Sequence, residues 1–108
     1  KSAPGFGPIG PWLVTADEVP DPQALRLSLA LNGETVQDSD TSDMIFGVAE
    51  IISYMSRFMA LVPGDLIATG TPSGVGLGMT PPRFLRAGDV MELSVEGLGT
   101  QRQEVVAG

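Results

Sequence analysis

The residues best suited to chemistry lie in a glycine-rich segment, 70–78, which reads GTPSGVGLG. Its glycines would let a ligand approach exposed backbone N–H groups, and Thr69 and Thr71 add hydroxyls where a predicted strand ends. The alternative is a tight loop whose threonines only satisfy the loop's own backbone. The glycine spacing does not match the dinucleotide-binding fingerprint, and no Lys follows as in a phosphate-binding P-loop. The segment therefore predicts a small-molecule contact or a self-contained turn, and not a nucleotide site.

Lys1 is the only lysine in the sequence, and a segment rich in Gly and Pro follows it. Its ammonium could bind a carboxylate or stabilise a developing enolate, because a positive charge lowers the energy of the anion that forms. The competing interpretation is a solvated surface charge, the common role of a single lysine. Composition alone leaves both interpretations open.

Two pairs of carboxylates have a spacing that could serve a metal. Asp38 and Asp40 form an Asp-x-Asp pair that could offer oxygens to a hard cation. They also precede a predicted helix, where acidic side chains cap the N-terminus, and this is the interpretation that we adopt. Glu92 and Glu96 share the polar face of a predicted strand and are expected to face solvent.

Composition excludes several kinds of chemistry. The sequence has no His and no Cys, so it offers no Ser-His-Asp triad, no imidazole acid or base, no thiolate nucleophile and no Cys-based zinc site. A net charge of −7 and a pI near 4.2 argue against nucleic acid as a partner. No apolar run reaches the roughly 20 residues of a membrane span, so we expect a soluble, cytoplasmic protein. The sequence begins without Met, as a fragment or a processed product would.

An antiparallel hairpin is the clearest predicted element. Residues 24–31 alternate, with leucines on one face and Arg26 and Ser28 on the other. Asn32-Gly33 follows, the pair that favours the positive φ angles of a two-residue hairpin turn, and 34–38 is the returning strand. Upstream of the hairpin, the Gly and Pro content of 1–11 predicts a packed loop, followed by a short strand at 12–14 and a turn at 17–22.

One amphipathic helix is predicted after the hairpin. From Val48 onward apolar residues repeat at intervals of three and four, which predicts a helix that ends before Pro63-Gly64, and residues 40–43 offer its N-cap. We interpret its apolar stripe as core rather than as a ligand site. Further strands are predicted at 65–69, 90–95 and 101–106, with turns at 88–89 and 97–99. This order of elements predicts an α+β fold dominated by β structure.

Several segments, in order and over nearly the whole sequence, resemble the fumarylacetoacetate hydrolase family. Residues 1–14 are similar to the lysine loop and the Pro-x-Gly-Pro-Trp strand of that family. Its hairpin-to-helix passage is matched by Asp21-Pro22, Asn32-Gly33-Glu34, Gln37, Thr41 and DMIF at 43–46. Its most recognisable stretch is matched by PGDLI at 63–67 and TGTPSGVG at 69–76, and its closing strands by Gly88-Asp89, Met91-Glu92 and GLG at 97–99.

The resemblance implies a mixed β-roll with short helices and one main amphipathic helix. It implies a homodimeric enzyme that uses Mg²⁺ or Mn²⁺ to cleave C–C bonds in 2-oxo or 1,3-diketo acids through an enolate. Lys1 falls on the lysine that contacts the substrate's oxygens, Thr71 on the threonine that holds the substrate carboxylate, and Gly70 lets the loop approach that carboxylate. The family's metal-binding Glu-x-Glu pair and Asp have no match here. Residues 1–108 would then be the C-terminal part of one catalytic domain, with the metal ligands upstream.

Two alternatives stay open. The same enolate would serve an isomerase or decarboxylase of unsaturated 2-oxo diacids in the degradation of aromatic compounds. The lid residues that discriminate these reactions in the family have no counterpart in this sequence. The 108 residues by themselves could instead be a catalytically silent, β-rich module.

Overall fold

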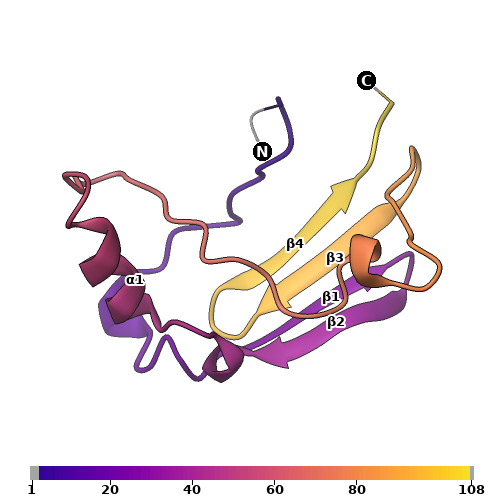
Figure 1. Cartoon of the computed structure of the whole chain (residues 1–108). Coiled ribbons are helices and arrows are strands. Elements are labelled where there is room, and N and C mark those ends of the chain that lie inside the picture. The colour runs from indigo at the N-terminus through magenta and orange to yellow at the C-terminus, as the bar shows by residue number, and fades with distance from the viewer. Residues whose placement is uncertain (1–2, 108) are drawn as a thin grey trace.

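The protein is built on an antiparallel sheet with a short α-helix beside it. A computed structural model describes residues 3–107 (Figure 1). The strands β1 (Arg26–Leu31), β2 (Glu34–Asp40), β3 (Val90–Val95) and β4 (Gly99–Glu104) lie in the order β2-β1-β3-β4, and each neighbouring pair is antiparallel. The helix is α1 (Val48–Met55), and short 3₁₀ turns form at η1 (Ala16–Glu18), η2 (Thr41–Asp43) and η3 (Gly76–Gly78). The predicted α+β fold dominated by β structure is confirmed.

The hairpin of β1 and β2 forms around the predicted Asn-Gly turn. Asn32 has a φ of 53° and Gly33 a φ of 83°, the pair of positive angles that a type I′ turn requires. The amide of Asn32 also donates to Asp89 at 2.8 Å, and its carbonyl oxygen accepts from the N–H of Val90 at 2.8 Å. The turn therefore also fixes the start of β3.

A bulge interrupts the pairing of β1 with β2. Leu29 is opposite Gln37 and Ala30 is opposite Thr35, so Val36 is an extra residue on β2. Directly opposed residues share a face of a sheet, which places Gln37 on the same face as Leu29. We call this side the leucine face; it presents Leu27, Leu29 and Leu31 of β1 and Met91, Leu93 and Val95 of β3.

The closing strand pair forms as predicted, except that both ends of the last strand differ. A turn at residues 96–98 joins β3 to β4, and Val95 is opposite Gly99. The last strand begins two residues earlier than expected and ends at Glu104. Val105 still exchanges backbone hydrogen bonds of 2.8 Å with Gly88 and Asp89 beyond the end of the strand.

The helix α1 begins at a cap that the sequence did not indicate. The side-chain oxygen of Gln23 accepts the N–H of Val48 at 2.6 Å, and its amide donates to the carbonyl of Thr41 at 3.1 Å. Asp40 caps the 3₁₀ turn η2 instead, accepting the N–H of Ser42 at 2.7 Å. The prediction that residues 40–43 cap the long helix is therefore wrong.

The same helix is shorter than the apolar periodicity predicts, because it ends at Met55 and not before Pro63. The hydroxyl of Ser56 donates to the carbonyl of Ser53 at 2.9 Å, the acceptor that Arg57 would use in a continuing α-helix. Arg57 donates instead to Tyr54 at 3.2 Å, which tightens the chain into a 3₁₀-type turn.

The predicted strands at 12–14 and 65–69 are not strands in the structure. A strand needs a hydrogen-bonded neighbour, and neither segment pairs with the sheet β2-β1-β3-β4. Trp12 packs over Gly99, where a Cβ would lie 2.7 Å from the indole ring. Gln101 on the leucine face donates to the carbonyl of Gly10.

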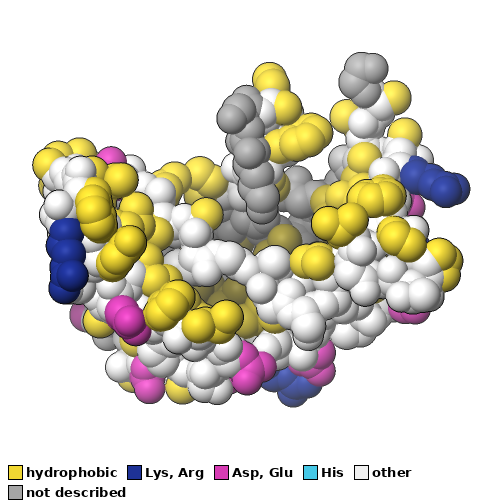
Figure 2. Space-filling model, in the orientation of Figure 1, with side chains coloured by type: hydrophobic (Ala, Val, Ile, Leu, Met, Phe, Trp, Pro, Cys, Tyr) yellow, Lys and Arg dark blue, Asp and Glu magenta, His cyan; other side chains and the backbone are white. Residues whose placement is uncertain are grey.

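Burial within this chain is limited. Among residues 3–107, Leu31 is the only buried apolar side chain, with 6% of its surface exposed. Large apolar side chains are exposed around α1 and along the segments above the sheet (Figure 2). The described part of the chain has no helix with the length and apolar character needed to cross a bilayer.

Candidate functional site

The loop at 70–78 lies against β2, and two of its glycines permit that position. A Cβ on Gly74 would overlap the carbonyl oxygen of Val36, and a Cβ on Gly76 would overlap that of Arg83. Both glycines therefore serve close approach of the chain to itself. The same explanation does not extend to Gly70, which has a φ of 104° and open space around the position of a Cβ. Gly70 thus leaves the backbone beside Thr71 accessible, as the predicted carboxylate contact needs.

Thr71 is exposed at the start of this loop and has one strong partner. The side-chain amide of Gln37 donates to the Thr71 hydroxyl oxygen at 2.8 Å and also to the carbonyls of Pro72 at 3.0 Å and Ser73 at 3.3 Å. The hydroxyl of Thr71 has a long contact of 3.5 Å to the Pro72 carbonyl. These contacts hold the loop in place, with Gly70 and Thr71 next to each other at its start. Their substrate roles stay predictions.

Lys1 lies outside the described residues, and its contact with the substrate's oxygens stays a prediction.

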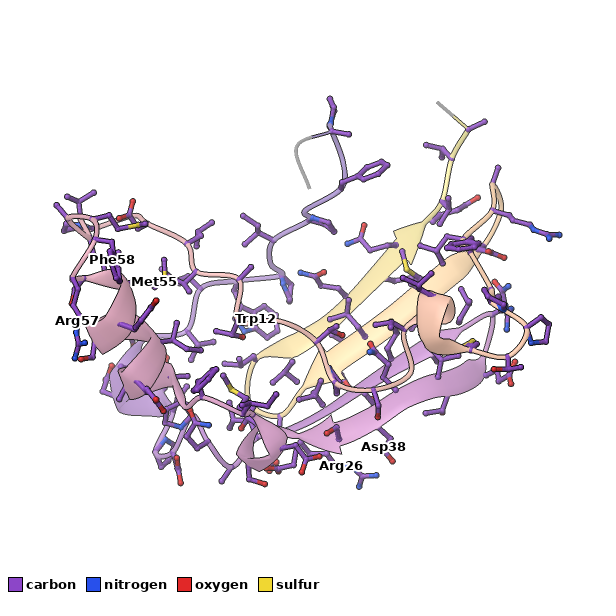
Figure 3. All side chains as sticks on the ribbon, in the orientation of Figure 1. Trp12, Arg26, Asp38, Met55, Arg57 and Phe58 are labelled. Atoms are coloured by element: carbon purple, nitrogen blue, oxygen red, sulfur yellow. The ribbon has the colours of Figure 1, made fainter. Side chains whose placement is uncertain are left out.

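The pair of Asp38 and Asp40 is engaged in contacts within the chain. Arg26 forms two bonds to Asp38, of 3.1 Å from Nε and 2.9 Å from the terminal nitrogen (Figure 3). This guanidinium lowers the pKa of Asp38, first by hydrogen bonding and then by its charge. The pKa of Asp40 is lowered because its carboxylate accepts the backbone N–H and side-chain hydrogen bonds of Ser42. These contacts place the pair at the cap of η2 and in a surface ion pair, and not at the N-terminus of α1.

The glutamates of β3 and the turn after it lie on the polar side of the sheet. Glu92 is 3.9 Å from Arg102, and Glu96 accepts the backbone N–H of Arg26 at 3.4 Å. Within residues 3–107, no group of three or more His, Cys, Asp or Glu side chains is arranged to hold a metal ion. The described residues therefore do not fit the divalent metal that the family resemblance implies.

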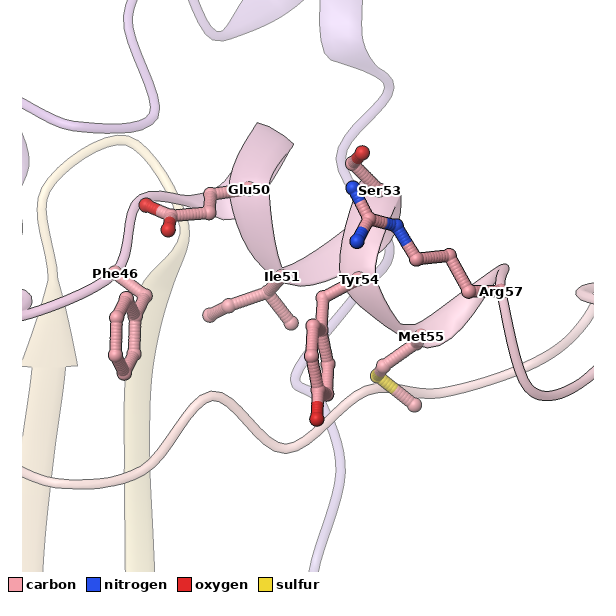
Figure 4. Close-up of a pocket in the computed structure, with 7 residues that line it drawn as sticks. All are labelled: Phe46, Glu50, Ile51, Ser53, Tyr54, Met55 and Arg57. Atoms are coloured by element: carbon pink, nitrogen blue, oxygen red, sulfur yellow. The ribbon is translucent and has the colours of Figure 1, made fainter.

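Two grooves lie away from the loop at 70–78. A groove of about 630 Å³ runs along α1, and Figure 4 shows the side chains that line it: Phe46, Glu50, Ile51, Ser53, Tyr54, Met55 and Arg57. A more polar groove of about 480 Å³ lies on the side of the sheet that carries Arg26 and Asp38. Neither groove includes Gly70 or Thr71. The larger groove is mostly apolar and its lining holds no arrangement of acid, base and nucleophile.

Comparison with known sequences identifies the family. The profile described as fumarylacetoacetate (FAA) hydrolase C-terminal matches residues 1–106. The chain belongs to the fumarylacetoacetate hydrolase family. The resemblance stated from the motifs is thereby confirmed.

Relatives within the fumarylacetoacetate hydrolase family include hydrolases and an isomerase. A 2,4-didehydro-3-deoxy-L-rhamnonate hydrolase of Sphingomonas sp. (strain SKA58) is 58% identical over 101 residues, which cover 93% of this chain and 35% of that protein. The crystal structure of maleylpyruvate hydrolase from Sphingobium sp. SYK-6, in complex with manganese(II) ion and pyruvate, matches with a TM-score of 0.82 and 38% identity, over 92% of this chain and 35% of that one. That of 2-hydroxyhepta-2,4-diene-1,7-dioate isomerase from Mycobacterium marinum matches with a TM-score of 0.77 and 43% identity, over 90% and 34%.

These coverages show that the chain spans about a third of the length of the family members that it matches, 35% for the rhamnonate hydrolase. Membership in this family supports the prediction that the protein is an enzyme. The relatives are named for more than one reaction, hydrolysis and isomerisation. The maleylpyruvate hydrolase was crystallised with manganese(II), which supports the use of a divalent metal within the family.

Sequence reasoning missed the role of Gln37 at this site. Gln37 is one of the residues that carry the family resemblance, but no local pattern links it to Thr71, 34 positions away. A regular hairpin would have put it on the opposite face, so only the bulge at Val36 brings it to the loop.

Proposed function

We propose that the protein containing this chain is a metal-dependent enzyme that cleaves C–C bonds in 2-oxo or 1,3-diketo acids, of the acylpyruvate or fumarylacetoacetate type, through an enolate. The observation that supports this most is the loop at 70–78, in which the exposed Thr71 hydroxyl and the open backbone at Gly70 lie side by side. Two such donors suit a carboxylate, since charge-assisted hydrogen bonds from hydroxyl and N–H groups to carboxylates are strong.

Thr71 and Gly70 would hold the substrate carboxylate, and Lys1 would contact the oxygen that gains charge. Water adds to the acyl carbon, which then leaves as a carboxylic acid. Cleavage of the C–C bond puts the electron pair on the other carbon, and resonance places it on the neighbouring carbonyl oxygen as an enolate. An ammonium beside that oxygen lowers the energy of the developing anion. These roles rest on the family's motifs and on the geometry of the loop.

We place the metal ligands in the part of the protein N-terminal to residue 1. The described residues supply no cluster that fits Mg²⁺ or Mn²⁺, whereas the maleylpyruvate hydrolase relative was crystallised with manganese. The chain would then be the C-terminal part of a single catalytic domain. We also propose a cytoplasmic homodimer that binds a small 2-oxo acid and has no nucleic acid or membrane partner.

The alternative function is isomerisation or decarboxylation of unsaturated 2-oxo diacids in the breakdown of aromatic compounds. The structural similarity to a 2-hydroxyhepta-2,4-diene-1,7-dioate isomerase favours it. Both reactions pass through an enolate, so Lys1, Gly70 and Thr71 would keep their roles. The isolated 108 residues would be silent under either function.

The test is turnover by the full-length polypeptide with Mg²⁺ or Mn²⁺, assayed with acylpyruvates for cleavage and with an unsaturated 2-oxo diacid for isomerisation and decarboxylation. Loss of a hydroxyl that binds a carboxylate should lower kcat/KM roughly 10- to 100-fold, so Thr71→Val should show this loss and Thr71→Ser should not. Lys1→Ala should lower turnover by about 100-fold or more.

A matched control is Thr100→Val, because Thr100 is an exposed threonine on β4, away from the loop. Full activity of Thr71→Val and Lys1→Ala would overturn the site assignment. Metal-dependent turnover by the isolated 108 residues, at the rate of the full-length protein, would overturn the placement of the metal ligands upstream.

A further inference from the structure

Gln37 is a polar side chain of β2 that reaches the loop at 70–78 from the leucine face. It is half-buried and lies opposite Leu29 in the pairing of β1 with β2. The residue before it, Val36, is the bulge residue whose carbonyl oxygen abuts Gly74. Two neighbouring residues of one strand therefore fix the loop, Val36 through the close backbone approach and Gln37 through hydrogen bonds.

The orientation of the Gln37 amide follows from its partners. Its nitrogen lies 3.0 Å from the carbonyl oxygen of Pro72 and 3.3 Å from that of Ser73. Carbonyl oxygens can only accept hydrogen bonds, so an amide flipped to present its own oxygen would lose the contacts to both carbonyls and keep only one bond, from the Thr71 hydroxyl. The NH₂ group must therefore point to the loop.

This orientation also decides the role of the Thr71 hydroxyl. The NH₂ group has two hydrogens for three oxygens, and the Thr71 hydroxyl oxygen is the nearest of them at 2.8 Å, so it takes one hydrogen while the two carbonyls share the other. Because an amide nitrogen has no acceptor capacity, the hydroxyl accepts in this contact. The hydroxyl's own hydrogen then points elsewhere. Its acceptor in the chain is the Pro72 carbonyl at 3.5 Å, at the limit of hydrogen bonding. An anion placed beside Thr71 would offer this hydrogen a much better acceptor.

We propose that Gln37 is a positioning residue that fixes Thr71 as a hydrogen-bond donor toward the substrate carboxylate. It does so by occupying the hydroxyl oxygen and by holding the Pro72 and Ser73 carbonyls, which fix the backbone that follows Thr71. Gln37 does not touch the substrate itself. This inference rests on the proposed function, because it takes the substrate to be a carboxylate bound at Thr71.

The experiment compares Gln37→Met and Gln37→Glu with the wild-type full-length enzyme. Gln37→Met keeps the length of the side chain and removes its donor. Gln37→Glu keeps the shape but presents an acceptor, which would take the Thr71 hydrogen and repel the carboxylate. We expect KM for a 2-oxo acid to rise roughly tenfold in Gln37→Met and further in Gln37→Glu, with kcat changing less than about threefold, since binding and not chemistry is lost.

Two further measurements separate positioning from general stability. The preference for the free acid over its methyl ester should fall in both Gln37 variants, because the ester lacks the anion that Thr71 binds. In a Thr71→Val background, Gln37→Met should raise KM less than about twofold, since residues that act through one another are non-additive. Gln103→Met is the control, because Gln103 lies on the same face but its amide contacts Gln101 at 3.5 Å rather than the loop.

The outcomes distinguish this inference from the proposed function. No turnover of any 2-oxo acid by the wild-type enzyme overturns both. A second outcome overturns the inference alone. In it the wild-type enzyme is active and Thr71→Val raises KM, but Gln37→Met and Gln37→Glu have the same KM as the control Gln103→Met. The inference is also overturned if the acid-to-ester preference is unchanged, or if the effects of Gln37→Met and Thr71→Val simply multiply.

Discussion

The loop at 70–78 is fixed by contacts within the chain, whereas the outer side of α1 is largely exposed. Contacts within the chain fix the loop, through three hydrogen bonds from Gln37 and the close backbone approaches at Gly74 and Gly76. The outer side of α1 has large apolar side chains that contact little else (Figure 2). We call this surface the α1 apolar face; its residues are Ile45, Phe46, Ile52, Tyr54, Phe58 and Met59.

The two regions differ in whether contacts within these 108 residues are enough to hold them. Polar contacts and close backbone approaches within this chain hold the loop. The α1 apolar face leaves Ile45 90% exposed and Phe58 70% exposed, and several large exposed apolar side chains around one element are of the kind that other protein covers. Because the chain spans 35% of the length of its rhamnonate hydrolase relative, we expect the rest of the polypeptide to cover this face.

The largest effect is expected from Gly76→Ala, which tests whether the loop is closed by steric fit. The new Cβ would overlap the Arg83 carbonyl oxygen, and backbone on both sides must move. We expect a loss of about 3 kcal/mol in the free energy of unfolding, measured with urea, as for severe overpacking. Gly78→Ala is the matched control, since its Cβ would meet only Val75 at 3.8 Å. Equal stability of the two variants would show that the loop is loosely held.

The next effect is expected on the α1 apolar face, from Phe58→Ala in the full-length protein. If the rest of the polypeptide covers this face, removing the ring should cost about 3 kcal/mol, as for a buried aromatic residue. The ring packs against that of Tyr54, with centroids 5.1 Å apart (Figure 3 labels Phe58 at the end of α1). A change below about 0.5 kcal/mol in the same urea titration would show an exposed residue and an open face.

A smaller effect is expected at the start of α1, from Gln23→Leu. This change removes the acceptor of the Val48 N–H and the donor to the Thr41 carbonyl, so both groups lose their partner. We expect a loss of about 1–2 kcal/mol, the usual cost of removing a helix cap, measured by thermal unfolding. Gln103→Leu serves as the control. If both substitutions lower Tm equally, the cap at Gln23 is not what holds α1.

The smallest effect is expected from Asp38→Asn on the exposed surface of the sheet. Arg26 lowers the pKa of Asp38 in the folded protein, so the ion pair stabilises the fold above the ordinary Asp pKa of about 3.9. This contribution is lost as the pH falls through the lowered pKa. The wild type should therefore be slightly more stable than Asp38→Asn at neutral pH, and the difference should vanish in acid. A difference independent of pH, measured by urea unfolding, would contradict this.

The parts of the fold that the sequence predicted are those decided by neighbouring residues. Asn32-Gly33 specifies its own turn, and the alternating leucines place β1 next to it, so the hairpin formed where expected. The end of α1 was missed because the hydroxyl of Ser56 competes for a carbonyl that periodicity counts as part of the helix. The segments at 12–14 and 65–69 were misassigned because extended backbone becomes a strand only beside a partner.

The candidate site divides in the same way. Gly70 and Thr71 were found from the composition of their loop and the family motif, and the structure adds that Gly74 and Gly76 serve contacts within the chain. The support from Gln37 could not be predicted, because it depends on a tertiary contact between β2 and a loop that follows α1.

The extra residue at Val36 has a consequence for how this segment tolerates insertions and deletions. Counted from the turn, an uninterrupted hairpin would pair Leu29 with Val36 and Ser28 with Gln37, so odd and even positions of β2 would exchange sides. Removing one residue before Gln37 would thus send its amide to the Arg26 side of the sheet without changing the amino acid. The number of residues between the turn and Gln37 therefore decides whether Gln37 faces the loop. A single-residue deletion there would remove the hydrogen bond from Gln37 to Thr71 more completely than most substitutions would.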